Sequence, residues 1–166
     1  MLLKSNDLTK SLELNSLATR FILFSSCFIL VNLFFLDTPK ANSQNAEFFI
    51  ERGIKKAKSG DYIGAFNAYS KALKINPSSS SAYYNRAYDK ATVGDIMGAI
   101  EDYTKVIEIT PYDADAFYNR GNAKVDLKEY KASITDYNTA IDINPKYSDA
   151  YYKRGNAKTN LKSYKD

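Results

Sequence analysis

The sequence contains no histidine and a single cysteine among its 166 residues. Without histidine the chain cannot build a histidine-assisted nucleophile or a zinc site of the His and Cys type, and Cys27 has no partner for a disulfide within the chain. Carboxylates remain as acid or base groups, but Asp102 and Asp136 are predicted on the polar sides of helices without a pocket signature. We therefore expect a protein that is not an enzyme and needs no cofactor or metal.

An excess of charge of one sign is also lacking. The 23 basic and 19 acidic residues leave a formal net charge of +4. This charge is too small to indicate a nucleic-acid partner, and the length corresponds to about one domain. The composition alone thus favours no particular function.

The sequence does contain an internal repeat of 34 residues, of which residues 114–145 are the clearest copy. Three of only four prolines are 34 places apart, at Pro77, Pro111 and Pro145. Arginines and tyrosines recur with the same period, at Arg52, Arg86, Arg120 and Arg154 and at Tyr69, Tyr103 and Tyr137. Self-similarity of this kind indicates an array of stacked structural units.

Each unit is predicted to form a helical hairpin, because apolar and small residues recur in it with helical spacing in two stretches. Between the stretches lies a residue suited to left-handed backbone, followed by a carboxylate that caps the next helix. These pairs are Gly60-Asp61, Gly94-Asp95 and Lys128-Glu129. The second helix must end before the proline, which lacks the amide donor and disfavours helical backbone in the residue before it.

The repeat resembles the tetratricopeptide repeat (TPR) family. That family carries aromatic, small and proline residues at fixed places, which in the third unit are Phe117, Gly121, Tyr130, Ser133, Tyr137, Ala140 and Pro145. The chain departs from the family at two places, where each unit has arginine instead of leucine and lysine instead of an aromatic. The lysines are Lys56, Lys90, Lys124 and Lys158.

This resemblance implies an all-α protein, a right-handed α-solenoid of TPR hairpins over residues 44–166. Three full repeats are expected at 46–79, 80–113 and 114–147, with a partial fourth at 148–166. A single hairpin cannot cover its own apolar face, so we expect the units to stack on one another.

Residues 1–43 are predicted to be a signal peptide or an uncleaved membrane anchor. Their hydrophobic core, residues 21–36, is short for a spanning helix, which needs about 20 residues, but long enough for a secretory signal. The small residues at 41–43 suit a signal peptidase, and cleavage there would leave Gln44 first. Both alternatives place the repeats on the non-cytoplasmic side of a membrane, because the positively charged segment stays inside.

The resemblance implies a function in protein–protein interaction, through a concave groove lined by the first helices of the hairpins. The groove-facing places are the second, fifth, sixth, ninth, twelfth and thirteenth of each unit. We expect a peptide or partner helix to contact Tyr84, Asn85, Tyr88, Tyr118, Asn119, Asn122, Tyr152, Lys153 and Asn156. Alternatively, the asparagines bond to neighbouring repeats and only fix the stacking.

Two further expectations concern charge and assembly. Arg86 and Arg120 are expected to pair with Asp102 and Asp136, as partly exposed ion pairs worth at most about 1 kcal/mol each. Alternatively, the recurring arginines and lysines form two basic columns that an acidic partner could bind. Apart from a non-catalytic adaptor or scaffold, the chain could be a structural element that self-associates through its incomplete C-terminal repeat, or an accessory to a separate enzyme. The identity of a protein partner does not follow from the sequence.

Overall fold

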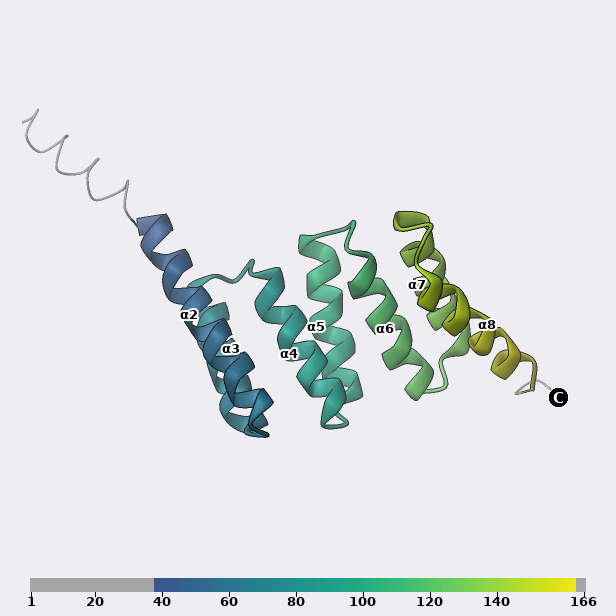
Figure 1. Cartoon of the computed structure of the whole chain (residues 1–166), viewed down its shortest axis with the longest axis horizontal. Coiled ribbons are helices and arrows are strands. Elements are labelled where there is room, and N and C mark those ends of the chain that lie inside the picture. Colours follow the sequence, from purple (N-terminus) through teal and green to yellow (C-terminus); the bar gives the residue numbers. More distant parts are fainter. Residues whose placement is uncertain (1–37, 164–166) are drawn as a thin grey trace, which may run out of the picture. The chain divides into compact units, whose positions relative to one another are not determined.

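The computed structural model describes residues 38–163, with side chains from Asn45 onward, and this part of the chain is all helical (Figure 1). The chain divides into two compact units, residues 1–42 and 43–166, and the described helices belong to the second unit except for the first residues of α2. The helices are α2 (Thr38–Lys58), α3 (Tyr62–Ile75), α4 (Ser80–Thr92), α5 (Ile96–Ile109), α6 (Ala114–Asp126), α7 (Tyr130–Ile143) and α8 (Ser148–Ser163).

The turns inside the hairpins follow the predicted chemistry in two repeats and depart from it in the third. Gly60 and Gly94 have left-handed backbone, with φ of 82° and 88°. The side chains of Asp61 and Asp95 then accept hydrogen bonds from the first turns of α3 and α5. In the third repeat Lys128 has a φ of 61°, and Glu129 makes no capping hydrogen bond.

The helix ends elsewhere are also set locally. The Ser79 hydroxyl accepts a hydrogen bond from the Ala82 amide at 3.3 Å, and Asp113 accepts one from the Ala116 amide at 3.0 Å, so these residues cap α4 and α6. The second helices α3, α5 and α7 each end one residue before the C-cap that precedes a repeated proline. The aligned prolines therefore terminate equivalent helices, as the sequence predicts.

Small and large residues are complementary where the two helices of a hairpin cross. The repeated tyrosines Tyr69, Tyr103 and Tyr137 are at most 2% exposed. A Cβ atom at Gly121 would lie 2.8 Å from the Tyr137 ring, and one at Gly53 would overlap the Tyr69 ring. The glycines therefore make room for the tyrosines.

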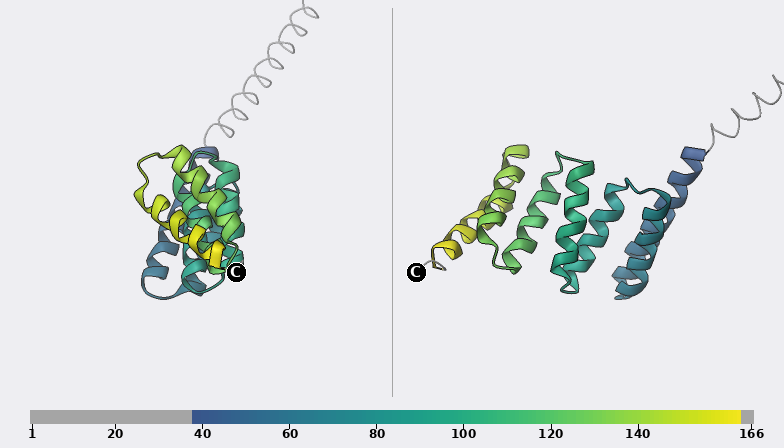
Figure 2. Two further views of the ribbon diagram at one scale, coloured as in Figure 1. Left: turned by 90° about the vertical axis from the view of Figure 1, so that its right-hand side faces the viewer. Right: turned by 180° about the vertical axis from the view of Figure 1, so that it is seen from behind.

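The hairpins stack on one another in chain order (Figure 2). From α3 onward each helix contacts the next, and the first helices α4, α6 and α8 also contact in sequence. The buried residue Ala82 of α4 joins Ile50, Tyr69 and Ala72 of the first hairpin in one core cluster. The expected solenoid of TPR-like hairpins is confirmed for this part of the chain.

The expected membrane localisation needs correction. Among the residues that the structure describes, no helix combines the length and the apolar character needed to cross a bilayer. These described residues therefore give no support to the expected anchored or exported state. The predicted hydrophobic core at 21–36 lies outside the described residues.

Candidate functional site

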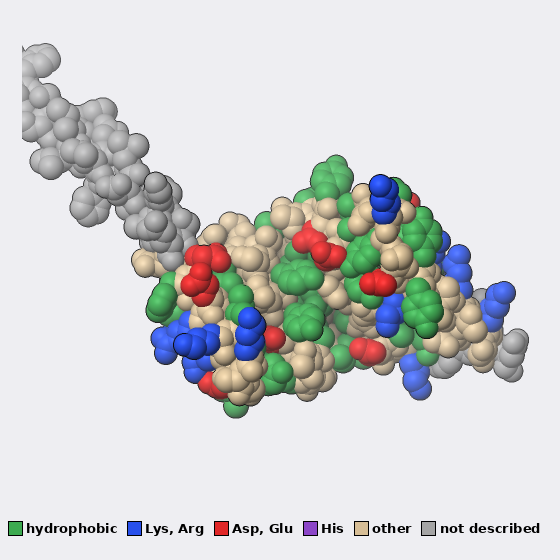
Figure 3. Space-filling view, viewed as in Figure 1, with side chains coloured by type: hydrophobic (Ala, Val, Ile, Leu, Met, Phe, Trp, Pro, Cys, Tyr) green, Lys and Arg blue, Asp and Glu red, His purple; other side chains and the backbone are tan. Residues whose placement is uncertain are grey.

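The first helices of the hairpins, α2, α4, α6 and α8, lie on one side of the stack, which we call the A-helix face. Figure 3 views the molecule from this side. Hydrophobic and tyrosine side chains gather over its middle together with acidic ones, whereas most Lys and Arg side chains lie toward its two ends. Any partner on the middle of this face would meet aromatic rings and carboxylates.

Three cavities follow this face, each between two consecutive first helices. Cavity A, between α2 and α4, has a volume of about 360 Å³, and its lining includes Asn85, Tyr88 and Asp89. Cavity B, between α4 and the start of α6, has about 350 Å³ and again includes Asn85. Cavity C, between α6 and α8, has about 220 Å³ and includes Asn122 and Lys153.

Cavity A contains a buried carboxylate. Asp89 is only 7% exposed and accepts a hydrogen bond of 2.9 Å from the Tyr69 hydroxyl. Burial raises the pKa of Asp89 above its usual value, against the opposing effect of this hydrogen bond. Burial, and then the bond to Asp89, raises the pKa of Tyr69 well above its usual value. The phenol and the buried carboxyl group therefore form a poorly solvated, hydrogen-bonded pair.

Cavity B is lined by tyrosine, asparagine and carboxylates. Burial, followed by the charges of Asp115 and Asp113, raises the pKa of Tyr84 to about 12. The Tyr84 hydroxyl accepts a hydrogen bond of 2.8 Å from Nδ2 of Asn119, which belongs to the next repeat. Asn85 donates to the Ser81 carbonyl within its own helix. The local potential is negative, and one wall is fixed by a bond between repeats.

Cavity C combines amides with one cation. The Tyr137 hydroxyl donates a hydrogen bond of 2.8 Å to Oδ1 of Asn122. Lys153 and Asn156 reach the cavity from α8, and Asp126 faces them from α6. Lys153 and Asn156 are exposed, so they are available to a ligand.

The structure brings six of the nine predicted groove residues to these cavities. They are Tyr84, Asn85, Tyr88, Asn122, Lys153 and Asn156. Of the others, Asn119 makes the bond between repeats that the alternative interpretation expected, and Tyr118 packs against the rings of Tyr137 and Tyr147. Tyr152 is 68% exposed but lines none of the three cavities.

The predicted set missed the carboxylates of these cavities. Asp115 and Asp126 occupy the second and thirteenth places of their unit, which the family resemblance already marks as groove-facing. Asp113 precedes that unit, and Asp89 lies at a tenth place that the family pattern does not mark. Within the described residues, no group of three or more His, Cys, Asp or Glu is arranged to hold a metal.

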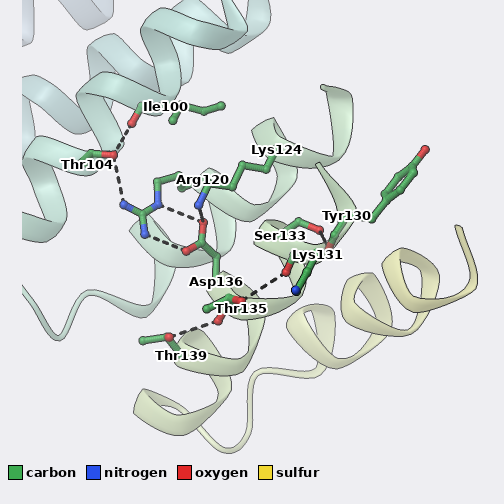
Figure 4. Close-up of polar contacts among 10 residues, drawn as sticks. All are labelled: Ile100, Thr104, Arg120, Lys124, Tyr130, Lys131, Ser133, Thr135, Asp136 and Thr139. Atoms are coloured by element: carbon green, nitrogen blue, oxygen red, sulfur yellow. Dashed lines mark hydrogen bonds and ion pairs between the residues drawn. The ribbon is translucent and has the colours of Figure 1, made fainter. Parts of the chain in front are cut away.

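Arg86 and Arg120 form the predicted ion pairs, and these are more buried than expected; the pair of Arg120 is drawn in Figure 4. The Arg120 guanidinium donates to both carboxylate oxygens of Asp136, at 3.0 and 2.8 Å, and Nζ of Lys124 lies 2.7 Å from the same carboxylate. Arg86, Lys90 and Asp102 repeat the arrangement. The aspartate side chains are only 4–5% exposed, so these are interior clusters and not polar-surface pairs.

Arg86 and Arg120 each also link two repeats. Nη1 of Arg120 donates to the Thr104 hydroxyl in the preceding repeat at 3.1 Å, and Nη1 of Arg86 donates to Ser70 at 3.3 Å. These bonds connect α6 to α5 and α4 to α3. The recurring basic residues therefore fix the stacking, and the carboxylates that sequence reasoning placed on polar faces are their internal partners.

The family model for the TPR repeat matches residues 93–127 and 121–161. The chain is a tetratricopeptide repeat protein. The matched segments cover the third hairpin and parts of its neighbours, where the 34-residue pattern is most regular. No curated protein sequence matches the chain.

Solved structures with the same fold include several TPR domains. The TPR domain of Arabidopsis OM64 is 26% identical over 71% of this chain and 98% of its own, with a TM-score of 0.67. MamA is 30% identical over 71% of this chain, which spans 64% of the MamA chain, with a TM-score of 0.68. The first TPR of Spaghetti (RPAP3), solved with the HSP90 peptide SRMEEVD, is 24% identical over 72% of this chain and 94% of its own, with a TM-score of 0.69.

Proposed function

We propose that this TPR solenoid is a protein-interaction module that binds an extended segment or a helix of a partner protein along the A-helix face. The observation that carries the proposal is the row of three cavities between successive first helices. Tyrosine supplies large contact area at low entropic cost, and asparagine both donates to and accepts from a peptide backbone. Asn85 lines two of the cavities and makes the row continuous from α2 to α6.

The carboxylates of the row favour a partner segment that carries Lys or Arg. Asp89, Asp113, Asp115 and Asp126 are distributed over all three cavities. Asp89 is held in a poorly solvated position, where an opposite charge would gain more than it does in water. The HSP90 peptide of the Spaghetti (RPAP3) structure is acidic, but at 24% identity that likeness carries the fold alone.

A selection from random displayed peptides against the full chain tests this function. We expect enrichment of Lys and Arg, and selected peptides should bind about tenfold more weakly to Tyr88→Ala and to Asp89→Asn. Asp89→Asn keeps an acceptor for the Tyr69 hydroxyl, so its fold should be intact. Asp142→Asn is the matched control, because this exposed carboxylate lies on α7 outside the cavities. A selection that returns no peptides with Lys or Arg, or equal binding of such peptides to all variants, would reject the proposal.

Self-association through α8 is a second candidate, favoured by one observation. Tyr151 and Tyr152 of this helix are 44% and 68% exposed. Sedimentation of the full chain over a wide concentration range tests the idea. A monomer at every concentration would remove it, and a dimer that Tyr151→Ser with Tyr152→Ser abolishes would support it.

A further inference from the structure

The first hairpin lacks the acidic residue that completes the arginine cluster in the second and third. Ala68 stands 34 residues before Asp102 and 68 before Asp136. Two other acids of α5 are also missing from α3, since Asn67 replaces Glu101 and Lys74 replaces Glu108. Helix α3 therefore carries no acidic residue at all.

A cavity of about 180 Å³ occupies this part of the first hairpin, beside α2 and α3. Arg52, Lys56 and Lys71 line it together with Asn67, Ala68 and Phe49. No residue of this cavity lines cavities A, B or C. It is therefore a separate site from the one proposed above.

The cations of this cavity are only partly neutralised. Within the described part of the chain, Arg52 makes no ion pair or hydrogen bond, although the equivalent Arg86 and Arg120 each bind a carboxylate. Lys56 pairs with Asp61, and Lys71 lies over the Phe49 ring at 5.7 Å. The exposed Lys74, three residues after Lys71 on α3, adds positive charge outside the lining of the cavity.

The chain itself shows which ligand fits such a site. In the third repeat the same two residue types, Arg120 and Lys124, hold one carboxylate between them at distances of 2.7 to 3.0 Å. We propose that the cavity of the first hairpin binds the carboxylate of an Asp or Glu side chain from an acidic segment of a partner protein. A carboxylate of this segment takes the place of the aspartate that the first hairpin lacks at Ala68. The other acidic residues of the segment pair with the surrounding lysines.

Fluorescence anisotropy with a labelled peptide of alternating Glu and Ser tests the proposal on the full chain. Arg52→Met should weaken binding by about tenfold, because it removes the charge-assisted hydrogen bonds to the carboxylate. Arg154→Met is the matched control, since it makes the same change of charge at the equivalent place of the fourth repeat and should leave binding within about twofold. Equal losses in the two variants would show that only net charge matters and would overturn the proposal.

A second pair of variants tests the site by filling it. Ala68→Asp should place a carboxylate beside Arg52, as in the next two repeats, and should reduce peptide binding by about tenfold. Thr135→Glu adds the same charge at an exposed place on α7 and should not reduce it. Unchanged binding to Ala68→Asp, in a variant whose circular dichroism shows a folded chain, would overturn the proposal.

Two further measurements identify the source of the carboxylate and separate this site from the A-helix face. Acetate at the same carboxylate concentration should displace little peptide, and full displacement would show a free-anion site and reject the acidic segment. Asp89→Asn should leave binding of the Glu-Ser peptide unchanged. Failure of the peptide selection described above would not affect this result, because the two sites share no lining residue.

Discussion

Replacing the repeated arginine by methionine at each of its four places should give a graded loss of stability. The four sites keep the same backbone place but differ in the partner of the guanidinium. Arg120 has a carboxylate, Arg154 has the neutral amide of Asn138 at 2.7 Å, and Arg52 has no partner among the described residues. Methionine preserves much of the aliphatic stem, so the series isolates the charge and its hydrogen bonds.

The expected magnitude at Arg120 follows from the burial of its partner. The Asp136 side chain is 4% exposed and the Arg120 side chain 16%, so solvent screens the pair little. Breaking a buried pair costs about 3–5 kcal/mol, and because Lys124 stays beside the carboxylate we expect the lower end, about 3 kcal/mol. Arg154→Met should cost at most about 1 kcal/mol, and Arg52→Met less than about 0.5 kcal/mol.

Urea denaturation followed by far-ultraviolet circular dichroism measures these differences in the free energy of unfolding. Position along the array is a competing explanation, because terminal repeats are less supported by neighbours. Adding Asp136→Ala to Arg120→Met separates the two, since it removes the orphaned buried charge and should recover part of the loss. Equal losses at all four arginines, or no recovery in the double variant, would refute the reasoning.

Five other substitutions should alter unfolding by urea in a defined direction. Lys128→Gly relieves left-handed backbone at a non-glycine residue and should stabilise by about 1 kcal/mol, whereas Gly94→Ala imposes that strain and should destabilise by a similar amount. Gly121→Ala pushes a methyl group against a buried ring and should cost about 1–3 kcal/mol, while Gly155→Ala, which meets nothing within 4 Å, should stabilise by up to about 1 kcal/mol. Burial raises the pKa of Asp89, so its native state binds the proton more tightly than the unfolded state, and stability falls as pH rises from 3.8 through the raised pKa. Asp89→Asn should therefore be more stable than the native chain at neutral pH, and this gain should disappear in a pH titration below that window.

The hairpins and their turns could be predicted from sequence because they depend on local chemistry that repeats. Gly60 and Gly94 mark a left-handed turn directly, and the 34-residue register transfers that assignment to Lys128, which no local rule would select. The ion pairs were predictable for the same reason, since arginine and aspartate recur with one period. Periodicity therefore identifies the partners even where single residues are ambiguous.

The burial of these pairs was not predictable from one unit. Asp136 lies on the polar side of α7 when that helix is considered alone, but the cations of α6 cover it in the folded array. The same limit applies to the A-helix face. Asn119 and Asn122 share a helix, and only the position of the neighbouring hairpin decides that Asn119 bonds to Tyr84 while Asn122 lines a cavity. Contacts between hairpins depend on the rotation and the distance between neighbouring hairpins. The numbered positions of one repeat do not contain this information.

Residues that depart from the repeat pattern indicate where a ligand binds, which the repeated residues do not indicate. Asp89 shares its place with Lys55, Ala123 and Ala157, and Ala68 shares its place with two aspartates. Residues that hold a solenoid together must serve every interface, so they recur, whereas a ligand contacts particular repeats and needs particular side chains. The buried carboxylate of Asp89 costs stability, and Ala68 leaves Arg52 without an acidic partner. Neither feature contributes to the stacking of the repeats. Both are therefore the places where substitution should change binding far more than it changes the fold.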